Sequence, residues 1–128
     1  MELLVATTFG AVLVDLETEE AELVDDDAPL PGVTDVVLPL LVAADQVGTR
    51  IVAVVDRRPP LVISDDSGSS WNEAGGGLPA GVAIAIDPAH PDWIVFASDS
   101  RLYLSDDGGR FWRSLEPELI GITAIAFA

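Results

Sequence analysis

Two nearly identical octets constrain the fold of this chain more than any other feature of its sequence. Residues 64–71 read SDDSGSSW and residues 105–112 read SDDGGRFW, and each octet lies between two short apolar runs. A turn sequence that recurs at a fixed spacing is typical of a repeat architecture, in which each repeat is one supersecondary unit. A sandwich built from unrelated hairpins does not predict this recurrence. We therefore expect a repeat of about 40 residues.

The chain divides into three similar stretches, at 2–39, 50–88 and 92–128. The second and third each contain short apolar runs rich in Val, Ile and aromatic residues, bounded by Gly, Asp, Ser and Pro. Such runs predict β-strands, and no stretch has the apolar stripe and capping residues of a helix. Four antiparallel strands in about 40 residues are the unit of a β-propeller blade. The sequence predicts an all-β domain over residues 1–128, a partial β-propeller of about three four-stranded blades.

Both octets fit the pattern S-x-D-x-G-x-x-W, with matches at Ser64, Asp66, Gly68 and Trp71 and at Ser105, Asp107, Gly109 and Trp112. The pattern resembles the Asp-box (BNR) repeat of sialidases, sortilin-like propellers and related bacterial and archaeal proteins. The resemblance implies that the octets are folding staples at the blade periphery, away from the ligand site. It covers the second and third stretches. The first stretch reads DLETEEAE at this place and has either lost the turn or formed a different one.

The chemistry of the octets also points to a structural role. In a tight turn, a carboxylate and a hydroxyl accept the backbone N–H groups that a hairpin tip leaves unpaired. We expect Gly68 and Gly109 to adopt positive φ, and each tryptophan to pack on its own blade with its N–H reaching an acceptor. The alternative is a calcium site at the paired aspartates, but these lack the dense oxygen spacing of an EF-hand loop. We predict no metal and no cofactor.

The ends of the chain are out of phase with the blades. The resemblance implies that VTDVVLP, VAIAIDP and ITAIAFA are innermost strands, so the chain ends with a lone innermost strand, Ile122–Ala128. Three blades leave sheet faces uncovered, because closed propellers have about four to eight blades. We predict a homo-oligomer in which Ile122–Ala128 completes the first blade of a neighbour, giving six blades in a dimer or nine in a trimer. A fragment of a longer propeller is the alternative.

The segment LLVAADQVGTR joins the first stretch to the second and is longer than the AHPD that joins the second to the third. We predict an extended loop or a short helical insert there.

Charge excludes several classes of partner. The chain has six arginines, no lysine and 22 carboxylates, for a net charge of −16. Such a field repels nucleic acid and anionic membranes, because both are bound through basic side chains. A carboxylate-rich surface is typical of proteins adapted to molar salt, so we predict a halophilic protein, with metal binding or a basic partner as alternatives. With no cysteine, no basic leader and no apolar run of about 20 residues, the chain is predicted to be soluble and cytoplasmic.

The ligand site of a propeller is expected at the end of the blades opposite the octets. The loops that lead into the innermost strands share this end with the loops that join the second and third strands of each blade. The candidate ligand-face residues there are Arg57, Arg58 and Arg101, with Asp25, Asp26 and Asp27. Three arginines on one face would grip a carboxylate or phosphate, whereas the alternative is that they neutralise neighbouring acids or pair with acids across subunits.

No catalytic residue is predicted. By resemblance, a sialidase needs an arginine cluster, an acid and a nucleophilic tyrosine, but the one tyrosine, Tyr103, lies inside the strand-like run RLYLS. His90 lies in the turn sequence DPAHPDW without a Ser–His–Asp motif. The sequence therefore predicts a non-catalytic β-propeller module for binding or assembly, with an unknown protein or glycan ligand. The alternative is part of a glycan-active propeller related to sialidases or glycoside hydrolases.

Overall fold

The computed structural model describes residues 1–25, 27–29 and 36–128, and within them it contains strands and turns but no helix. Twelve strands form three antiparallel sheets of four strands each, which we call blades 1, 2 and 3. The prediction of an all-β chain is confirmed, and the strands form three four-stranded sheets. None of the described residues belongs to a helix that could span a lipid bilayer.

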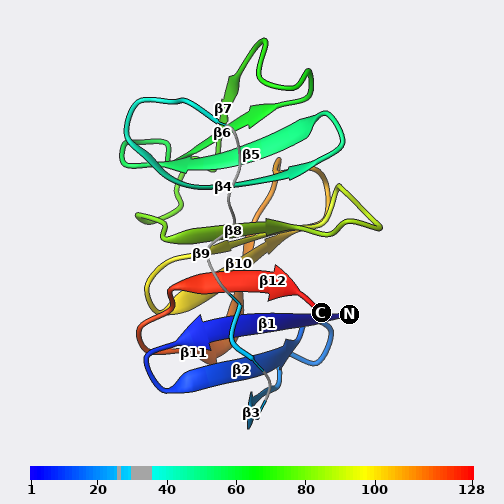
Figure 1. Cartoon of the computed structure of the whole chain (residues 1–128), viewed down its shortest axis with the longest axis vertical. Coiled ribbons are helices and arrows are strands. Elements are labelled where there is room, and N and C mark those ends of the chain that lie inside the picture. Colours follow the sequence, from blue (N-terminus) through cyan, green and yellow to red (C-terminus); the bar gives the residue numbers. More distant parts are fainter. Residues whose placement is uncertain (26, 30–35) are drawn as a thin grey trace.

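Each blade extends outwards from an innermost strand, and Figure 1 shows the three sheets. From the innermost strand, blade 1 contains β12 (Ala124–Phe127), β1 (Glu2–Thr7), β2 (Gly10–Asp15) and β3 (Ala21–Val24). In the same direction, blade 2 contains β4 (Leu41–Val47), β5 (Arg50–Val55), β6 (Leu61–Ser64) and β7 (Asn72–Ala74). Blade 3 contains β8 (Ala83–Ile86), β9 (Ile94–Ala97), β10 (Arg101–Ser105) and β11 (Arg113–Glu118).

The C-terminal strand β12 completes blade 1 of its own chain. It pairs antiparallel with β1, with Leu3 opposite Phe127 and Ala6 opposite Ala124. The backbone N–H of Thr123 extends this pairing by donating to the carbonyl of Ala6 at 2.9 Å. The sequence predicts that this strand completes a neighbour's blade, whereas in the structure one chain supplies all four strands because its two ends lie side by side (Figure 1).

The innermost strand of blade 2 differs from the sequence-based prediction. VTDVVLP (33–39) is not this strand: residues 33–35 lie outside the described residues and 36–39 are not in a strand. Instead LLVAADQVGTR, predicted as a loop or helical insert, forms β4 and the hairpin into β5. The physical reason is the two-residue turn at Gly48 and Thr49, where Gly48 has a φ of 59° and allows Val47 to pair with Arg50.

The three blades stand in the spatial order 2, 3, 1, which is not their order along the chain. The innermost strand of blade 3, β8, packs beside both β4 and β12. Figure 1 shows blade 2 and blade 1 at opposite ends of this row, with blade 3 between them. In the part of the chain that the structure describes, the row does not close into a ring.

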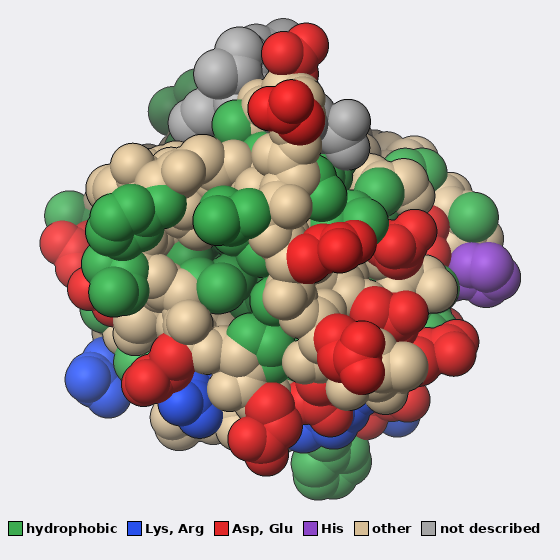
Figure 2. All heavy atoms as spheres, turned by 90° about the horizontal axis from the view of Figure 1, so that it is seen from below, with side chains coloured by type: hydrophobic (Ala, Val, Ile, Leu, Met, Phe, Trp, Pro, Cys, Tyr) green, Lys and Arg blue, Asp and Glu red, His purple; other side chains and the backbone are tan. Residues whose placement is uncertain are grey.

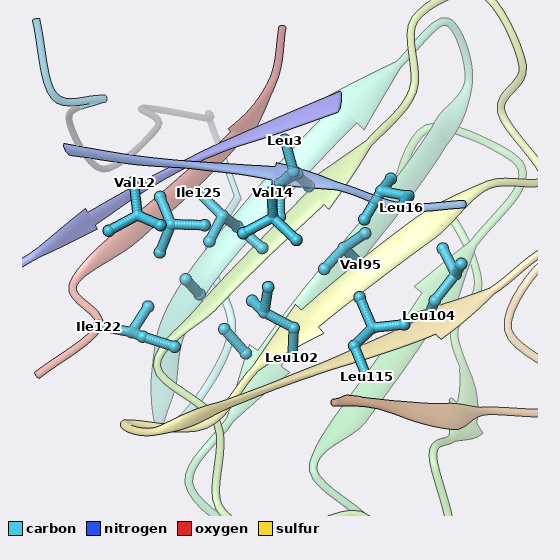
Figure 3. Close-up of a cluster of buried hydrophobic side chains, with 14 residues drawn as sticks. Leu3, Val12, Val14, Leu16, Val95, Leu102, Leu104, Leu115, Ile122 and Ile125 are labelled. Atoms are coloured by element: carbon cyan, nitrogen blue, oxygen red, sulfur yellow. The ribbon is translucent and has the colours of Figure 1, made fainter. Parts of the chain in front are cut away.

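The main core fills the two spaces between neighbouring blades. Leu3 and Val14 of blade 1 pack with Val95, Leu102 and Leu115 of blade 3, and Figure 3 shows their side chains pointing toward one another. A second cluster joins blade 2 to blade 3 around Phe96, which is fully buried. Blade 3 is therefore covered on both faces, and blades 1 and 2 each pack only one face against another blade.

Candidate functional site

The first octet forms a closed turn after β6. The Ser64 hydroxyl donates to Asp66 Oδ1 at 2.7 Å and accepts the backbone N–H of Gly68 at 2.7 Å. Asp66 also accepts the backbone N–H of Ser70 at 2.8 Å and the Ser70 hydroxyl at 2.6 Å. Gly68 has a φ of 93°, in the left-handed region that favours glycine. Side-chain oxygens thus satisfy the N–H groups at the tip of the hairpin.

The second octet forms nearly the same turn between β10 and β11. The Ser105 hydroxyl donates to Asp107 Oδ1 at 2.7 Å and accepts the N–H of Gly109 at 2.9 Å. Asp107 Oδ1 then accepts the N–H groups of the two residues after Gly109, both at 3.0 Å. Gly109 also has a φ of 93°. The recurrence in the sequence therefore corresponds to a recurrence in backbone geometry and hydrogen bonding.

The two octet tryptophans anchor these turns to their blades. Trp112 donates its indole N–H to the carbonyl of Gly109 at 3.0 Å, and its ring meets Phe96 edge-to-face at 6.3 Å between centroids. Trp71 packs against the apolar cluster on the face of blade 2 that is turned away from blade 3. Each octet thus joins a hairpin tip to the apolar face of a sheet.

Hydrogen bonding shifts the ionisation of both octet carboxyls. The hydroxyl and backbone N–H of Ser70, followed by the hydroxyl of Ser64, lower the pKa of Asp66 to about 2. The backbone N–H of Phe111, followed by the hydroxyl of Ser105, lowers the pKa of Asp107. Donors that point at a carboxylate favour its charged form, so both groups stay ionised as acceptors well below neutral pH.

The first repeat forms a different turn at the corresponding place. Asp15 Oδ1 accepts the N–H groups of Glu17 at 2.8 Å and Thr18 at 3.1 Å, and the bond from Thr18, followed by that from Glu17, lowers the pKa of Asp15. Glu19 follows in the left-handed region, with a φ of 60°. Its carboxylate accepts from the Arg113 guanidinium at 3.1 Å and so links blade 1 to blade 3. Of the two outcomes that the sequence left open, the structure has the alternative turn.

Arg50 forms a second link between blades that sequence reasoning missed. Its guanidinium contacts Asp65 Oδ1 at 2.8 Å and Asp92 Oδ1 at 2.9 Å, and also donates to the carbonyl of Pro91 at 3.0 Å. The hydrogen bond to Asp65 is the main cause of its raised pKa. The contacts join blade 2 to the loop between β8 and β9 of blade 3. Acids abound in the sequence, so only the spatial order of the blades shows which of them Arg50 meets.

The predicted ligand-face arginines lie around one loop. Arg57 and Arg58 line a cavity of about 180 Å³ with residues 78–81, and Arg101 lines a neighbouring groove that shares residues 79–81. Arg101 forms an ion pair with Glu118 at 3.2 Å, in agreement with the charge-neutralising alternative. Among the described residues, neither Arg57 nor Arg58 has an ion pair. We call this end of the blades the loop end.

The predicted acidic partners are not part of this cluster. Asp25 and Asp27 are exposed and line neither the Arg57–Arg58 cavity nor the Arg101 groove. Asp26 lies outside the described residues. The structure therefore brings the arginines close to one loop without placing the described aspartates beside them.

An apolar groove between blades 1 and 3 was also missed. It has a volume of about 310 Å³, lies at the loop end, and is lined on the blade 1 side by Phe9, Val12 and Leu23. Leu119 and Ile120 line its other side. Phe9 and Ile120 lie in predicted loops, where the signal was a large apolar residue at a position that turn chemistry does not require.

The outer faces of blades 1 and 2 are apolar as well. On blade 1, Leu3 and Val5 face blade 3, so their neighbour Leu4 faces away, opposite Leu13 and Ala126 in the register. These three side chains are half-buried. On blade 2, Val36, Leu38 and Trp71 pack on the outer face, while residues 40–42 remain exposed, with 46% of Val42 accessible.

Tyr103 and His90, the two residues considered for catalysis, each have a structural contact instead. Tyr103 is half-buried and packs edge-to-face on Phe96 at 6.0 Å between ring centroids. His90 is exposed at a turn, with Nδ1 3.4 Å from Asp87 Oδ2. In the described part of the chain, no group of three acidic or histidine side chains converges on a metal position.

No protein-family model matches the chain, and the comparisons with curated proteins and with solved structures found no match either.

Proposed function

We propose that the chain is a non-catalytic assembly and binding module, which joins with further copies of itself into a closed ring of blades. The observation that carries this proposal is the open row of blades, which has no neighbouring blade at either end. At the blade 1 end, Leu4, Leu13 and Ala126 are only half-buried. At the blade 2 end, Val36, Leu38 and Trp71 cover part of the outer face, and residues 40–42 beside them stay exposed. Sheets in water bury such faces against another layer, because each buried apolar Å² contributes about 25 cal/mol. A second copy offers the missing layer at both ends.

Two copies would close six blades, with blade 1 of each copy packing on blade 2 of the other. A contact between two different surfaces closes a ring when the rotation per subunit fits, and three copies would close nine blades. The pairing of β12 within its own chain changes the expected mode of closure. Ring closure would then occur through the outer sheet faces, such as the face of blade 1 that carries Leu4, Leu13 and Ala126. No exchanged strand is needed to complete a blade.

The test of assembly is the molar mass in solution in molar KCl, measured by light scattering after size exclusion. The chain mass is 13.5 kDa, so six blades correspond to twice this mass and nine blades to three times it. Val42→Asp places a charge on the exposed start of β4 and affects every junction of a ring at once, so we expect it to give a folded monomer. Phe111→Asp, at an exposed position in the second octet, is the matched control and should keep the wild-type mass. A wild-type protein with the mass of one chain in molar KCl would exclude the ring.

A further inference from the structure

Each junction between blades within the chain is bridged by an arginine of one blade and a carboxylate of the other. Arg50 of blade 2 contacts Asp92, in the loop between β8 and β9 of blade 3, at 2.9 Å. Arg113 of blade 3 contacts Glu19 of blade 1 at 3.1 Å. Opposite charges across a contact fix its register and disfavour wrong partners. The ring proposed above requires a third kind of junction, between blade 1 of one copy and blade 2 of the next.

The outer face of blade 1 is acidic. Strand alternation places Glu2 on the same face as Leu4, and the register of β2 with β3 places Glu22 opposite Leu13 on that face. Both glutamates are exposed, and among the described residues neither has an ion pair. The four strands of blade 1 contain no arginine or lysine. Figure 2 views the blade 1 end of the molecule and shows hydrophobic and acidic side chains next to one another there.

The outer face of blade 2 is apolar and carries a cation. Residues 37–42 are apolar throughout, and 99% of Val37 and 60% of Leu40 are accessible to solvent. Part of this run lines a groove of about 220 Å³ on the outer face, and the one charged residue in the described lining of this groove is Arg57. The neighbouring acid, Asp56, lines the loop-end cavity instead. Large apolar side chains gathered on one face are typical of an interaction site.

The two faces are complementary, and a single chain does not join them. Blades 1 and 2 lie at opposite ends of the row, with blade 3 between them (Figure 1). Contact between two copies of the blade 1 face would bring acidic side chains together, and contact between two copies of the blade 2 face would bring two arginines together. Like charges across a contact disfavour it. The occupant whose charge fits the blade 2 face is therefore blade 1 of a second copy.

We propose that Arg57 of one copy pairs with Glu22 of the next, and that this pair selects the head-to-tail junction. The inference rests on the proposed ring and adds the contact that decides its direction. Leu13 and Val62 both belong to the third strand of their blades, counted from the innermost strand. The third strands of blades 1 and 3 pack together in the cluster between those blades. The same stacking would bring Leu13 onto the groove that Val62 and Arg57 line, with Glu22 beside it.

The test is the dissociation constant of the assembly in about 0.2 M KCl, where screening is incomplete, measured by sedimentation over a dilution series. Arg57→Glu and Glu22→Arg each place like charges across every junction, so we expect each to raise the dissociation constant about tenfold. The double variant Arg57→Glu with Glu22→Arg carries the reversed pair at every junction and should regain the wild-type value. Arg57→Gln, which only removes the charge, should weaken assembly less, and it replaces Arg57→Glu if circular dichroism shows a loss of strands.

Arg110→Glu and Asp106→Arg are the matched controls, because they make the same charge changes at exposed positions of the second octet, on blade 3. Both should keep the wild-type dissociation constant. A wild type that stays a single chain even in molar KCl would exclude the ring and this contact with it. If the wild type assembles but neither single variant weakens it, the ring stands and the pairing is wrong. Weakening by only one of the two variants, or a double variant as weak as the single ones, would also overturn the pairing.

Discussion

Asp66 shows how a single carboxylate holds a hairpin tip together. It accepts hydrogen bonds from the Ser64 hydroxyl and from both donors of Ser70, and this lowers its pKa to about 2. This geometry could be predicted from the sequence, because all the residues that form it lie at fixed spacing within one octet. Side-chain acceptors close in sequence and a glycine at positive φ define the turn. The contact between Arg50 and Asp92 could not be predicted in this way, because the two residues lie far apart along the chain.

Replacing Asp66 by asparagine is expected to destabilise the protein in a pH-dependent way. The folded-state pKa of about 2 lies below the ordinary value of 3.8, so the stabilisation is complete above about pH 4 and is lost as the pH falls toward 2. The difference in urea midpoint between wild type and Asp66→Asn should therefore be largest at pH 5 to 7 and shrink between pH 4 and 2. Asp106→Asn, in the second octet, is the control. A difference that stays constant down to pH 2 would contradict the role assigned to this carboxylate.

At the scale of elements, the strands were predictable where short apolar runs are bounded by turn residues. β5, β6, β8, β9 and β10 all have this form, and the structure places them where the sequence does. The strand β4 was not recognised, because its run Leu41–Val47 includes Asp45 and Gln46 and breaks the apolar pattern. Asp45 has a structural role that only the neighbouring blade explains: its Oδ2 accepts the N–H of Ile86 in β8 at 2.8 Å.

The strand β12 is expected to contribute strongly to stability through its inner face. Ile125 is buried in the cluster between blades 1 and 3, so Ile125→Ala should cost about 2–4 kcal/mol in the free energy of unfolding. Ile120→Ala is the control for shape and hydrophobicity, and at this exposed position it should cost less than about 0.5 kcal/mol. Urea denaturation of both variants measures the difference. Equal costs would mean that β12 does not pack as the structure shows.

At the scale of the whole molecule, the charge and the open row of blades decide how the protein behaves in solution. Strand content and turn geometry depend on neighbouring residues and could be predicted, whereas the spatial order 2, 3, 1 depends on which apolar faces meet. The position of β12 shows why tertiary arrangement is harder to predict than strand content. The register of Leu4 with Ala126 is the same whether the two residues belong to one chain or to two, so the sequence pattern fits both arrangements.

The net charge of −16 predicts that salt stabilises the folded chain. Counter-ions screen the repulsion between exposed carboxylates, so the melting temperature should rise between 0.1 M and 2 M KCl, by a few degrees for each 1 kcal/mol gained. Sucrose at the same osmolality measures the stabilisation that an excluded solute gives without screening charge. A melting temperature that falls or stays constant between 0.1 M and 2 M KCl would contradict the predicted adaptation to salt.

One chain builds three four-stranded blades, and we propose that copies then meet through the outer faces of blades 1 and 2. The most direct measurement is a disulfide between Leu4→Cys and Ala126→Cys, made by oxidation in molar KCl and sized under denaturing, non-reducing conditions. Directly opposed residues of antiparallel strands lie within disulfide range, and the chain has no other cysteine. We predict an internally linked single chain of 13.5 kDa, even when the native assembly is larger. A covalent product of twice this mass would show that β12 completes the blade of another copy and would contradict the claim.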